Sequence, residues 1–344
     1  MRVLITGGTG LIGKTTCEHL LAKGWQVRSL DIATRQEPAA VEHLVGDILH
    51  FDTLVEAMNG CDAVVHLAAI RAPVLARASS VFEVNVAGTF NVFEAAARAG
   101  IRRVVQASSI NAFGFYYGTV DRIIRYLPVD EEHPIFTTDP YSFSKQVDEQ
   151  IGDYFWRRDG ISSVAMRFPA VLAPDYSARP EVQSRRTSSR QLIDELSRLP
   201  EALLAEQMHE AREYDKWFRA QRPMDYHPEN AILSDLIEKM SPLSRMYQLD
   251  RPNFWAALDV RDAAHAIELG LTAEYEGAHP LFINDRDNSL GYDAQTLARL
   301  FYPDVTEYRK TLAGTAALVC NTRAKLLIGY EPKYSVVNAG QPHN

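Results

Sequence analysis

The chain has 344 residues, of which 46% are hydrophobic, so it can bury a core larger than that of one ordinary domain. Its formal net charge of −8 argues against a nucleic-acid-binding or membrane-surface protein. The three cysteines, Cys17, Cys61 and Cys320, are odd in number and far apart, which argues against a disulfide framework or a zinc site and indicates a reducing compartment.

Short segments rich in β-forming residues alternate with segments of helical spacing through the first half of the chain. The predicted strands are RVLIT at 2–6, QVRSLD at 26–31, EHLVGD at 42–47, DAVVHLAA at 62–69, RRVVQASS at 102–109 and SSVAMRF at 162–168. Helical spacing covers residues 11–23, 52–58, 81–99 and 141–157. This alternation predicts an α/β fold, with a parallel sheet covered by helices on both faces.

The pattern changes near Pro174. From there to about Pro252 the sequence is polar and rich in Arg and Glu, and its helical stretches RQLIDELSRL and EALLAEQMHEAREYDKWF are separated by Pro200. A strand-and-helix pattern, FWAALDVRDAAHAIELGL, returns at 254–271. We therefore expect a large α/β domain with a helical insertion.

The sequence also bears on location. No apolar run reaches the roughly 18 residues needed to cross a bilayer. The first strand pattern begins at Arg2, which leaves no space for a signal peptide. Together with the cysteines, these features predict a cytoplasmic protein.

The sequence TGGTGLIG places Gly7, Gly10 and Gly13 between the first predicted strand and the first predicted helix. Glycines at this spacing permit a tight turn, let the backbone approach a pyrophosphate, and allow the helix to pack closely on the strand. The free N–H groups and the dipole of the helix N-terminus favour the same anion. A turn with a purely structural role is the alternative. The motif predicts a Rossmann-type, doubly wound sheet that binds a dinucleotide.

Asp31 ends the second predicted strand, 18 residues after Gly13. An acid at this position accepts hydrogen bonds from both ribose hydroxyls and repels a 2′-phosphate, which favours NAD over NADP. Arg35 lies close enough in sequence to weaken this preference, and Asp31 is alternatively a plain strand-end residue. Asp47 ends the third predicted strand, where its carboxylate either meets the adenine amino group or caps the helix that follows.

The sequence YSFSK places Tyr141 and Lys145 four residues apart, and such residues share one face of a helix. Asp139 and Pro140 before them are typical of a helix N-terminus. A cation about 4 Å from a phenol contributes roughly 4 kcal/mol at an effective dielectric near 20, or about 3 pKa units. We therefore expect Lys145 to lower the pKa of Tyr141 from about 10 toward about 7, where a general acid–base residue works best. An exposed amphipathic face is the alternative.

The sequence ASSINAFG follows at the end of the fifth predicted strand, at the carboxyl edge where doubly wound sheets bind ligands. Ser109 can hydrogen bond to the substrate oxygen that Tyr141 protonates or deprotonates. Ser108 is the weaker candidate of the two serines.

With these motifs, the chain resembles the extended short-chain dehydrogenase/reductases, in the NAD-dependent epimerase/dehydratase family. The resemblance rests on TGGTGLIG, DAVVHLAA, NVAGTFNVFEAA, VVQASSINAFG, DPYSFSK and MRFPAV, and it resumes at ALDVRDAAHAI and AKLLIGYEPKYS. We expect a dinucleotide-binding Rossmann domain over 1–172, to which 254–272 return, and a smaller, mostly helical substrate-binding region formed by 173–253 and 273–344.

The resemblance implies NAD as the cofactor, and no metal is expected. The catalytic residues it implies are Ser109, Tyr141 and Lys145, of which Lys145 also holds the nicotinamide ribose. The cofactor contacts or their supports would be Gly7, Gly10, Leu11, Ile12, Gly13, Asp31, Asp47, Ile48, Leu67, Ala68, Ala69, Asn85, Ala107, Tyr141, Lys145 and Phe168. The substrate-binding residues would be Ser109, Asn111, Ala170 and Arg185. His66 is expected to pack beside the cofactor rather than to act as a base.

The resemblance also implies a homodimer, in which the helices near 81–99 and 141–158 pair with their copies. The apolar residues on these helices either form that interface or pack within the subunit; they are Val86, Phe90, Phe93, Val147, Ile151 and Phe155.

The stretch after the sixth predicted strand departs from the family pattern. Members that act on nucleotide sugars usually carry a pattern like RxxNVYGP, whose Asn contacts the diphosphate, whereas this chain has RFPAVLAP, with Ala170 and Ala173. Phe115, Tyr116 and Tyr117 either stack on a sugar ring or pack in the core. The arginines of the insertion either clamp a phosphate or a sugar carboxylate or form solvated helix faces; they are Arg179, Arg185, Arg186, Arg190, Arg219, Arg222 and Arg245.

We therefore expect NAD-dependent hydride transfer at a carbinol carbon of a sugar or sugar derivative. A dehydrogenase of a free sugar or sugar acid competes closely with a nucleotide-sugar epimerase. A dehydratase would be expected to carry an acidic residue and a Thr beside the serine, whereas this chain has Ile110 and Asn111, which disfavours dehydration. A dinucleotide-binding sensor without turnover and a partner-binding role of the Arg-rich insertion are the remaining alternatives.

Overall fold

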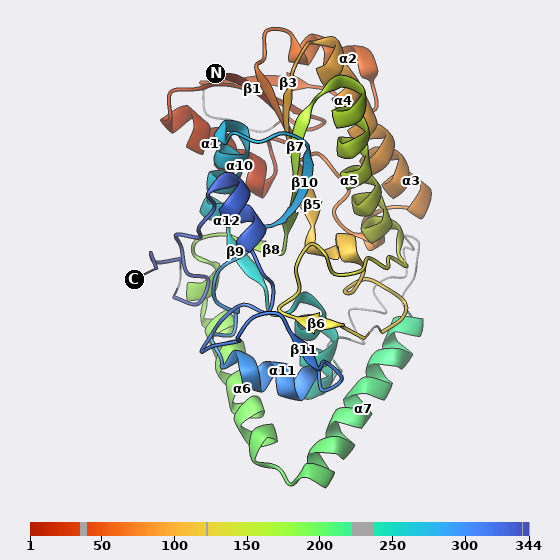
Figure 1. Cartoon of the computed structure of the whole chain (residues 1–344), viewed down its shortest axis with the longest axis vertical. Coiled ribbons are helices and arrows are strands. Elements are labelled where there is room, and N and C mark those ends of the chain that lie inside the picture. Colours follow the sequence, from red (N-terminus) through yellow and green to blue (C-terminus); the bar gives the residue numbers. More distant parts are fainter. Residues whose placement is uncertain (35–39, 122, 222–236, 238, 339, 344) are drawn as a thin grey trace.

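The computed structural model describes residues 1–34, 40–121, 123–221, 237, 239–338 and 340–343. Within them, seven parallel strands form a central sheet in the order β10-β7-β5-β4-β1-β2-β3 (Figure 1). The strands are β1 Arg2–Thr6, β2 Gln26–Asp31, β3 Val41–Val45, β4 Ala63–His66, β5 Arg103–Ser109, β7 Ser162–Phe168 and β10 Ala278–Phe282. The strand order reverses between β1 and β4, the place where doubly wound sheets bind ligands. The predicted α/β fold is confirmed.

Helices cover both faces of this sheet, because successive residues of each strand point to opposite faces. Val3 and Ile5 of β1 belong to the core under α1, α10 and α12. Leu4, between them, belongs to the core under α2, α4 and α5. The covering helices are α1 Leu11–Ala22, α2 Phe51–Met58, α4 Gly88–Arg98, α5 Pro140–Asp159, α10 Val260–Thr272 and α12 Thr322–Ile328.

Two strands bear on the expected division of the chain into domains. Residues 254–272 were expected to return to the domain formed by 1–172, and β9 (Ala257–Asp259) pairs with β8 (Ala170–Leu172), inside that range, in a separate two-stranded sheet, while α10 packs on α1. β10 lies in the segment expected to bind substrate, yet it pairs with β7 at the edge of the central sheet. Its sequence AHPLF is a weak strand pattern because it contains Pro280, which an edge strand tolerates.

A third apolar core lies beyond the carboxyl edge of the sheet, where α6, α7 and α11 are drawn in Figure 1. It combines the insertion, the C-terminal segments and the loop after β5, from which Phe113 and Phe115 pack against Phe254. The elements around it are α6 Pro180–Arg198, α7 Glu201–Ala220, α9 Pro242–Arg245, α11 Ala294–Phe301, β6 Tyr126–Leu127 and β11 Glu307–Tyr308. Among the described helices, none combines the length and hydropathy that crossing a bilayer requires.

The apolar residues expected at a dimer interface differ in their burial. Phe93, Ile151 and Phe155 are buried in the core of their own subunit. The large hydrophobic side chains that remain exposed on α3 (Ala78–Phe82), α4 and α5 form two stacked pairs, with ring centroids 5.7 and 6.0 Å apart. These pairs are Phe82 with Phe143 and Phe90 with Tyr154.

Candidate active site

The three predicted catalytic side chains meet at the carboxyl edge of the sheet. Ser109 is the last residue of β5, and Tyr141 and Lys145 lie in the first turns of α5. Asp139 begins this helix as predicted, because its side chain accepts a hydrogen bond from Ser142 N at 2.8 Å. Ser109, Tyr141 and Lys145 are 6%, 7% and 4% exposed, so the last two do not form an exposed helix face. The side chain of Ser109 hydrogen bonds to the Tyr141 hydroxyl.

The pKa of Tyr141 shifts in the direction opposite to the expectation. Burial raises it, the Lys145 ammonium and the Ser109 hydrogen bond lower it, and the resulting pKa is above the usual value for tyrosine. The prediction was wrong because it counted the cation and left out burial, which disfavours the phenolate. In this structure Tyr141 is therefore a protonated phenol at neutral pH.

Lys145 has a buried partner that the sequence reasoning missed. Its Nζ donates to Asp148 Oδ2 and to Ala107 O, each at 3.0 Å. Burial raises the pKa of Asp148 to about 6, although Lys145 lowers it. Burial lowers the pKa of Lys145, but Asp148 and Tyr141 raise it above its usual value. Lys145 is therefore a cation at neutral pH, and the spacing of three residues on one helix was the available signal for its partner.

A buried chain of hydrogen bonds connects this pair to the end of β1. His66, at the end of β4, contacts Thr6 Oγ1 through Nδ1 at 2.7 Å and Thr89 Oγ1 through Nε2 at 3.0 Å. Thr89 also hydrogen bonds to Asp148. Burial and the Lys145 charge lower the pKa of His66 to about 3, so its ring is neutral. With both nitrogens engaged, His66 orients its neighbours and is not placed to act as a base.

The glycine loop contains close contacts that a side chain would prevent. Gly7 has a φ of +73°, and a Cβ there would lie 2.7 Å from Ala68 N. A Cβ on Gly13 would lie 2.3 Å from Gly7 O, so α1 packs directly on the loop. Around Gly10, just before α1, the nearest such contact is 3.4 Å, which leaves the helix N-terminus approachable. This cradle fits a pyrophosphate bound by backbone N–H groups.

Asp31 lies at the end of β2 and faces the glycine loop. Its Oδ2 accepts hydrogen bonds from Thr9 N at 3.1 Å and Thr9 Oγ1 at 2.7 Å. The half-buried carboxylate is placed where a ribose would be bound. Arg35 lies outside the described residues. Asp47 accepts a hydrogen bond from Leu49 N at 2.9 Å, in the turn that precedes α2.

The other residues expected to contact or support the cofactor line the same edge of the sheet. Asn85 pairs with both backbone groups of Ile70, at 2.8 and 2.9 Å, and donates to Ser144 Oγ at 2.9 Å. It therefore joins the loop after β4 to α5. Phe168 ends β7, in register with Ser109. The remaining positions are in the first turn of α1, before α2 and after β4: Leu11, Ile12, Ile48, Leu67, Ala68 and Ala69.

The expected substrate residues have different surroundings. Asn111 lies in the short helix η3 (Ile110–Phe113), and its backbone N–H donates to Ser109 Oγ at 3.1 Å. Ala170 is exposed at the start of β8, and Arg185 is exposed on α6. The structure thus brings Asn111 to the catalytic serine and places the other two at the surface.

Several arginines of the insertion bind the protein's own backbone. Three of these guanidinium groups donate hydrogen bonds to two or three backbone carbonyls each. Arg186 donates to carbonyls of residues 336–337, Arg190 to those of 290–291, and Arg219 to carbonyls within 115–118. From the sequence, these arginines were expected either to clamp an anion or to form solvated helix faces. Their backbone contacts fit neither role. Arg179 forms an exposed ion pair with Asp175, and Arg245 is exposed. Arg222 lies outside the described residues.

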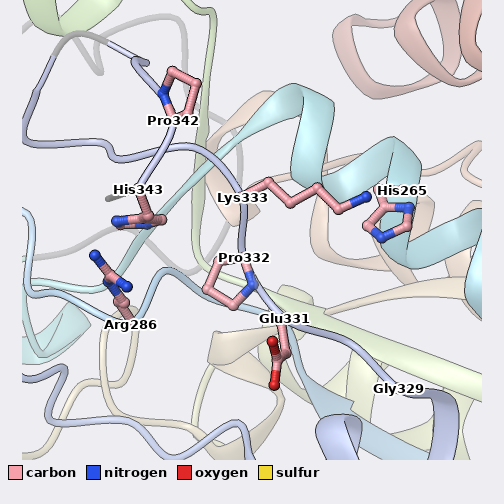
Figure 2. Close-up of a pocket in the computed structure, with 8 residues that line it drawn as sticks. All are labelled: His265, Arg286, Gly329, Glu331, Pro332, Lys333, Pro342 and His343. Carbon is pink, nitrogen blue, oxygen red and sulfur yellow. The ribbon is translucent and has the colours of Figure 1, made fainter.

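A cavity of about 510 Å³ lies between α10 and the C-terminal segment (Figure 2). Lys333 extends toward His265 on one side of the view, and His343 and Arg286 lie together on the other. Its lining does not include the catalytic side chains. The cavity is therefore separate from the candidate active site.

Two groups of described residues have side chains of the kind that bind metals: His19, His265 and Glu268, and Asp285, Asp287 and His343. In the first group, Glu268 lies 2.7 Å from His19 Nε2 and 2.9 Å from Lys23 Nζ. In the second, His343 Nε2 lies 2.7 Å from Asp285 Oδ1. Basic side chains of the protein thus already lie against these carboxylates, and we assign neither group to a metal.

Curated relatives include two sugar dehydrogenases. The chain is 34% identical over 180 residues to an L-arabinose 1-dehydrogenase (NAD(P)(+)) of Haloferax volcanii, which covers 51% of this chain and 68% of that protein. It is 31% identical over 207 residues to a uronate dehydrogenase of Pseudomonas syringae pv. tomato, and this match covers 59% of this chain and 69% of that protein. A UDP-glucose 4-epimerase of Bacillus subtilis is 31% identical over 181 residues, and the match spans 48% of this chain and 51% of that protein.

Solved structures share the fold at low sequence identity. A short-chain dehydrogenase/reductase superfamily protein from Agrobacterium tumefaciens, solved with bound NAD, matches at a TM-score of 0.64 and 21% identity, covering 98% of this chain and 94% of that one. A UDP-glucose 4-epimerase from Thermotoga maritima matches at a TM-score of 0.60 and 16% identity, covering 99% of this chain and 97% of that one. The NAD dependent epimerase/dehydratase family pattern matches residues 3–213, more than half of the chain. The protein is therefore an NAD-dependent enzyme that belongs to the epimerase/dehydratase family.

Proposed function

We propose that the enzyme transfers a hydride at a carbinol carbon of a free sugar or sugar acid, with Ser109, Tyr141 and Lys145 as its catalytic residues. The observation that carries the proposal is the convergence of these three buried side chains at the carboxyl edge of the sheet. A protein that only binds a dinucleotide needs no such group. The glycine loop and Asp31 supply the cofactor cradle beside them.

In this proposal the phenolate form of Tyr141 takes the hydroxyl proton of the substrate during oxidation, and the phenol so formed returns a proton during reduction. NAD, when bound, would supply the hydride acceptor for the carbinol carbon, so the proton and the hydride would go to different groups. Ser109 orients the substrate oxygen through its hydroxyl. Lys145 stabilises the phenolate by its charge, and Asp148 and Ala107 hold its Nζ in place. Because burial raises the pKa of Tyr141, this stabilisation is needed for the phenolate to form.

Two observations favour a free sugar or sugar acid over a nucleotide sugar. Ala170 and Ala173 stand where nucleotide-sugar enzymes usually carry the Asn and Gly of their diphosphate-binding pattern, and alanine offers no side-chain hydrogen bond. Arg186, Arg190 and Arg219 are bound to backbone carbonyls, which removes them as candidates for a diphosphate clamp. The dehydrogenase relatives point to the same class of substrate.

A nucleotide-sugar epimerase is the second candidate function, because one curated relative carries that name. The experiment that separates the two is a screen of aldoses, uronic acids and nucleotide sugars with added NAD, followed by absorbance of NADH and by product analysis. We expect NADH to accumulate with a free sugar or sugar acid. Product from a nucleotide sugar without net NADH would instead show epimerisation, and no product with any of these compounds would contradict the proposed function.

A further inference from the structure

The loop that follows Ser109 carries an aromatic side chain to Tyr141. The ring of Tyr117 lies edge-on to that of Tyr141, with centroids 5.7 Å apart and planes at 87°. Tyr116 lies edge-on to Tyr117 in turn, at 4.7 Å. Edge-to-face contact is a favourable aromatic geometry, and it restricts the positions open to both rings. The location of the Tyr141 phenol therefore depends on where the loop holds Tyr117.

The backbone of this loop is bound by Arg219, near the end of α7. The Arg219 Nη1 donates to three loop carbonyls at 2.8, 3.1 and 3.4 Å, which belong to Gly118, Phe115 and Tyr116. Its Nε donates to Asp215 Oδ2 at 2.9 Å, one helical turn earlier. The side chains of Arg219 and Asp215 are 0% and 1% exposed, so the pair lies entirely inside the protein.

The other side of the loop packs on the segment that leads into α5. Gly114 has a φ of +91°, and a Cβ there would lie 2.1 Å from Phe136 O. Thr119 N donates to Thr138 Oγ1 at 3.0 Å. The loop is therefore held between α7 and residues 136–138, three residues before Tyr141 itself.

A buried ion pair is a weak source of stability, because removing two charges from water offsets most of their attraction. Its better-attested use is to fix one conformation among several. The planar guanidinium suits this use, since its donors can reach carbonyls on one side and a carboxylate on another. Lysine, with a single ammonium, cannot reproduce that arrangement.

We propose that Arg219 is a positioning residue of the active site, which holds Tyr117 against Tyr141 by binding the backbone of residues 115–118. The inference rests on the catalytic role proposed for Tyr141. It gives the helical insertion a part in the reaction, since α7 supplies the side chain that shapes the loop beside the phenol.

The test removes both members of the buried pair together, so that no unpaired charge remains: Arg219→Gln with Asp215→Asn. Displacing a reacting group by about 1 Å costs roughly 100-fold in rate, so we expect kcat to fall by about 10- to 100-fold. The affinity for NAD, measured by protein fluorescence, should stay unchanged because the glycine loop is untouched. The matched control is Arg212→Gln on the same helix, whose guanidinium binds Asp304 and Tyr247 and not the loop.

A merely structural role is separated by a double-mutant cycle with Tyr117→Ala. If Arg219 acts through Tyr117, the single change Tyr117→Ala lowers kcat by a similar factor. Adding the pair substitution to it then causes a further loss of less than about 2-fold. The proposal would be overturned if the losses of kcat from the Tyr117 change and the pair substitution multiplied in the combined variant. A well-folded pair variant with wild-type kcat would overturn it as well. If the pair variant does not fold, Tyr117→Ala alone decides, and wild-type kcat in that variant refutes the inference.

Failure of this inference is distinguishable from failure of the proposed function. Tyr141→Phe is measured beside the other variants on the same substrate. An active Tyr141→Phe enzyme removes the catalytic role on which the inference rests. An inactive one, combined with unaffected Arg219 and Tyr117 variants, leaves the proposed function standing and refutes the positioning role.

Discussion

Lys145 Nζ and Asp148 Oδ2 lie 3.0 Å apart inside the protein, where their side chains are 5% and 1% exposed. Burial is the main cause of the raised pKa of Tyr141, and the negative charge of Asp148 adds to it. We predict that Asp148→Asn lowers the pKa of Tyr141, because it leaves the positive charge of Lys145 uncompensated. The alkaline rise of kcat/KM for alcohol oxidation should then move toward lower pH, as measured in pH–rate profiles.

The control for this change is Asp153→Asn on the same helix, whose carboxylate is exposed and paired with Arg157. Its profile should coincide with that of the wild type. A profile of Asp148→Asn that stays in place or moves toward higher pH would show that Asp148 does not set the acidity of Tyr141.

Tyr141→Phe should lower kcat by about 100-fold or more, because it removes the proton-transfer group. The affinity for NAD should barely change, since the cradle formed by Gly7, Gly10 and Gly13 is untouched. Steady-state rates and cofactor titration of the same preparation provide both measurements. Near wild-type turnover would refute the proposed role of Tyr141.

Lys145→Met should lower both kcat and the affinity for NAD, because the proposed role gives Lys145 a ribose contact as well as a charge. The alkaline rise of the pH profile should move upward, since the cation that stabilises the phenolate is gone. The double variant with Tyr141→Phe should be little worse than the worse single one, as for residues that act as a unit. Additive losses would show that the two act independently.

The sequence was enough to predict six of the seven strands of the described sheet and the convergence of the site, because these depend on local patterns. Apolar strands and the glycine spacing specify the parallel sheet, and Tyr141 and Lys145 share a helix face whatever surrounds them. Positions at the carboxyl ends of β1, β2 and β5 meet by topology alone. Gly7, Asp31 and Ser109 could therefore be placed at one edge without coordinates.

The direction of the Tyr141 pKa could not be predicted, because it depends on burial that only the packed structure defines. The partner of Lys145 was missed for the same reason, since an acid three residues away on a helix is usually a solvated side chain. The roles of Arg186, Arg190 and Arg219 depend on carbonyls about 100 or more residues away in the chain. No local pattern reports such contacts.

Asp31→Ala should narrow the difference in affinity between NAD and NADP, because it removes a carboxylate that would repel a 2′-phosphate. The same change also removes the acceptor of the Thr9 hydrogen bonds, so NAD affinity should fall. Thr9→Val is the control, since it deletes one of those hydrogen bonds and keeps the charge. Titration of the three proteins with both cofactors checks the prediction, and tighter binding of NADP by the wild type would refute the role of Asp31.

Glu268 on α10 should stabilise the packing of α10 on α1 in a pH-dependent way. Burial raises its pKa, but hydrogen bonds from Lys23, His19 and His265 outweigh burial and lower the pKa to about 2. Because the pKa of Glu268 is lower in the folded than in the unfolded protein, its ionised carboxylate contributes its full stabilisation above the unfolded pKa of about 4.5. This contribution is lost as the pH falls through the folded pKa of about 2. Allowing for screening by solvent, Glu268→Gln should cost about 1 kcal/mol at neutral pH, or about 1–2 °C in Tm for a chain of this length.

Thermal unfolding at several pH values measures this contribution. The difference in Tm between the wild type and Glu268→Gln should shrink as the pH falls below about 4.5. Glu274→Gln, an exposed acid just after the same helix, is the control and should match the wild type at each pH. A difference that persists unchanged at low pH would mean that packing, and not charge, is responsible.

The exposed aromatic pairs on α3, α4 and α5 should form the interface of a homodimer. Phe90 is 40% exposed and Tyr154 is 41% exposed, although both are large side chains that proteins usually cover. They stack on each other across α4 and α5, and a two-fold axis would place the two helices against their copies. We therefore expect a solution mass of twice the 38.6 kDa chain at micromolar concentration.

Phe90→Glu with Tyr154→Glu should give the monomer mass, because it places charges at the contact. Leu326→Glu is the control, since Leu326 on α12 is 81% exposed and lies outside these helices. A monomeric wild type, or a dimer that survives the double substitution, would show that this face serves another purpose.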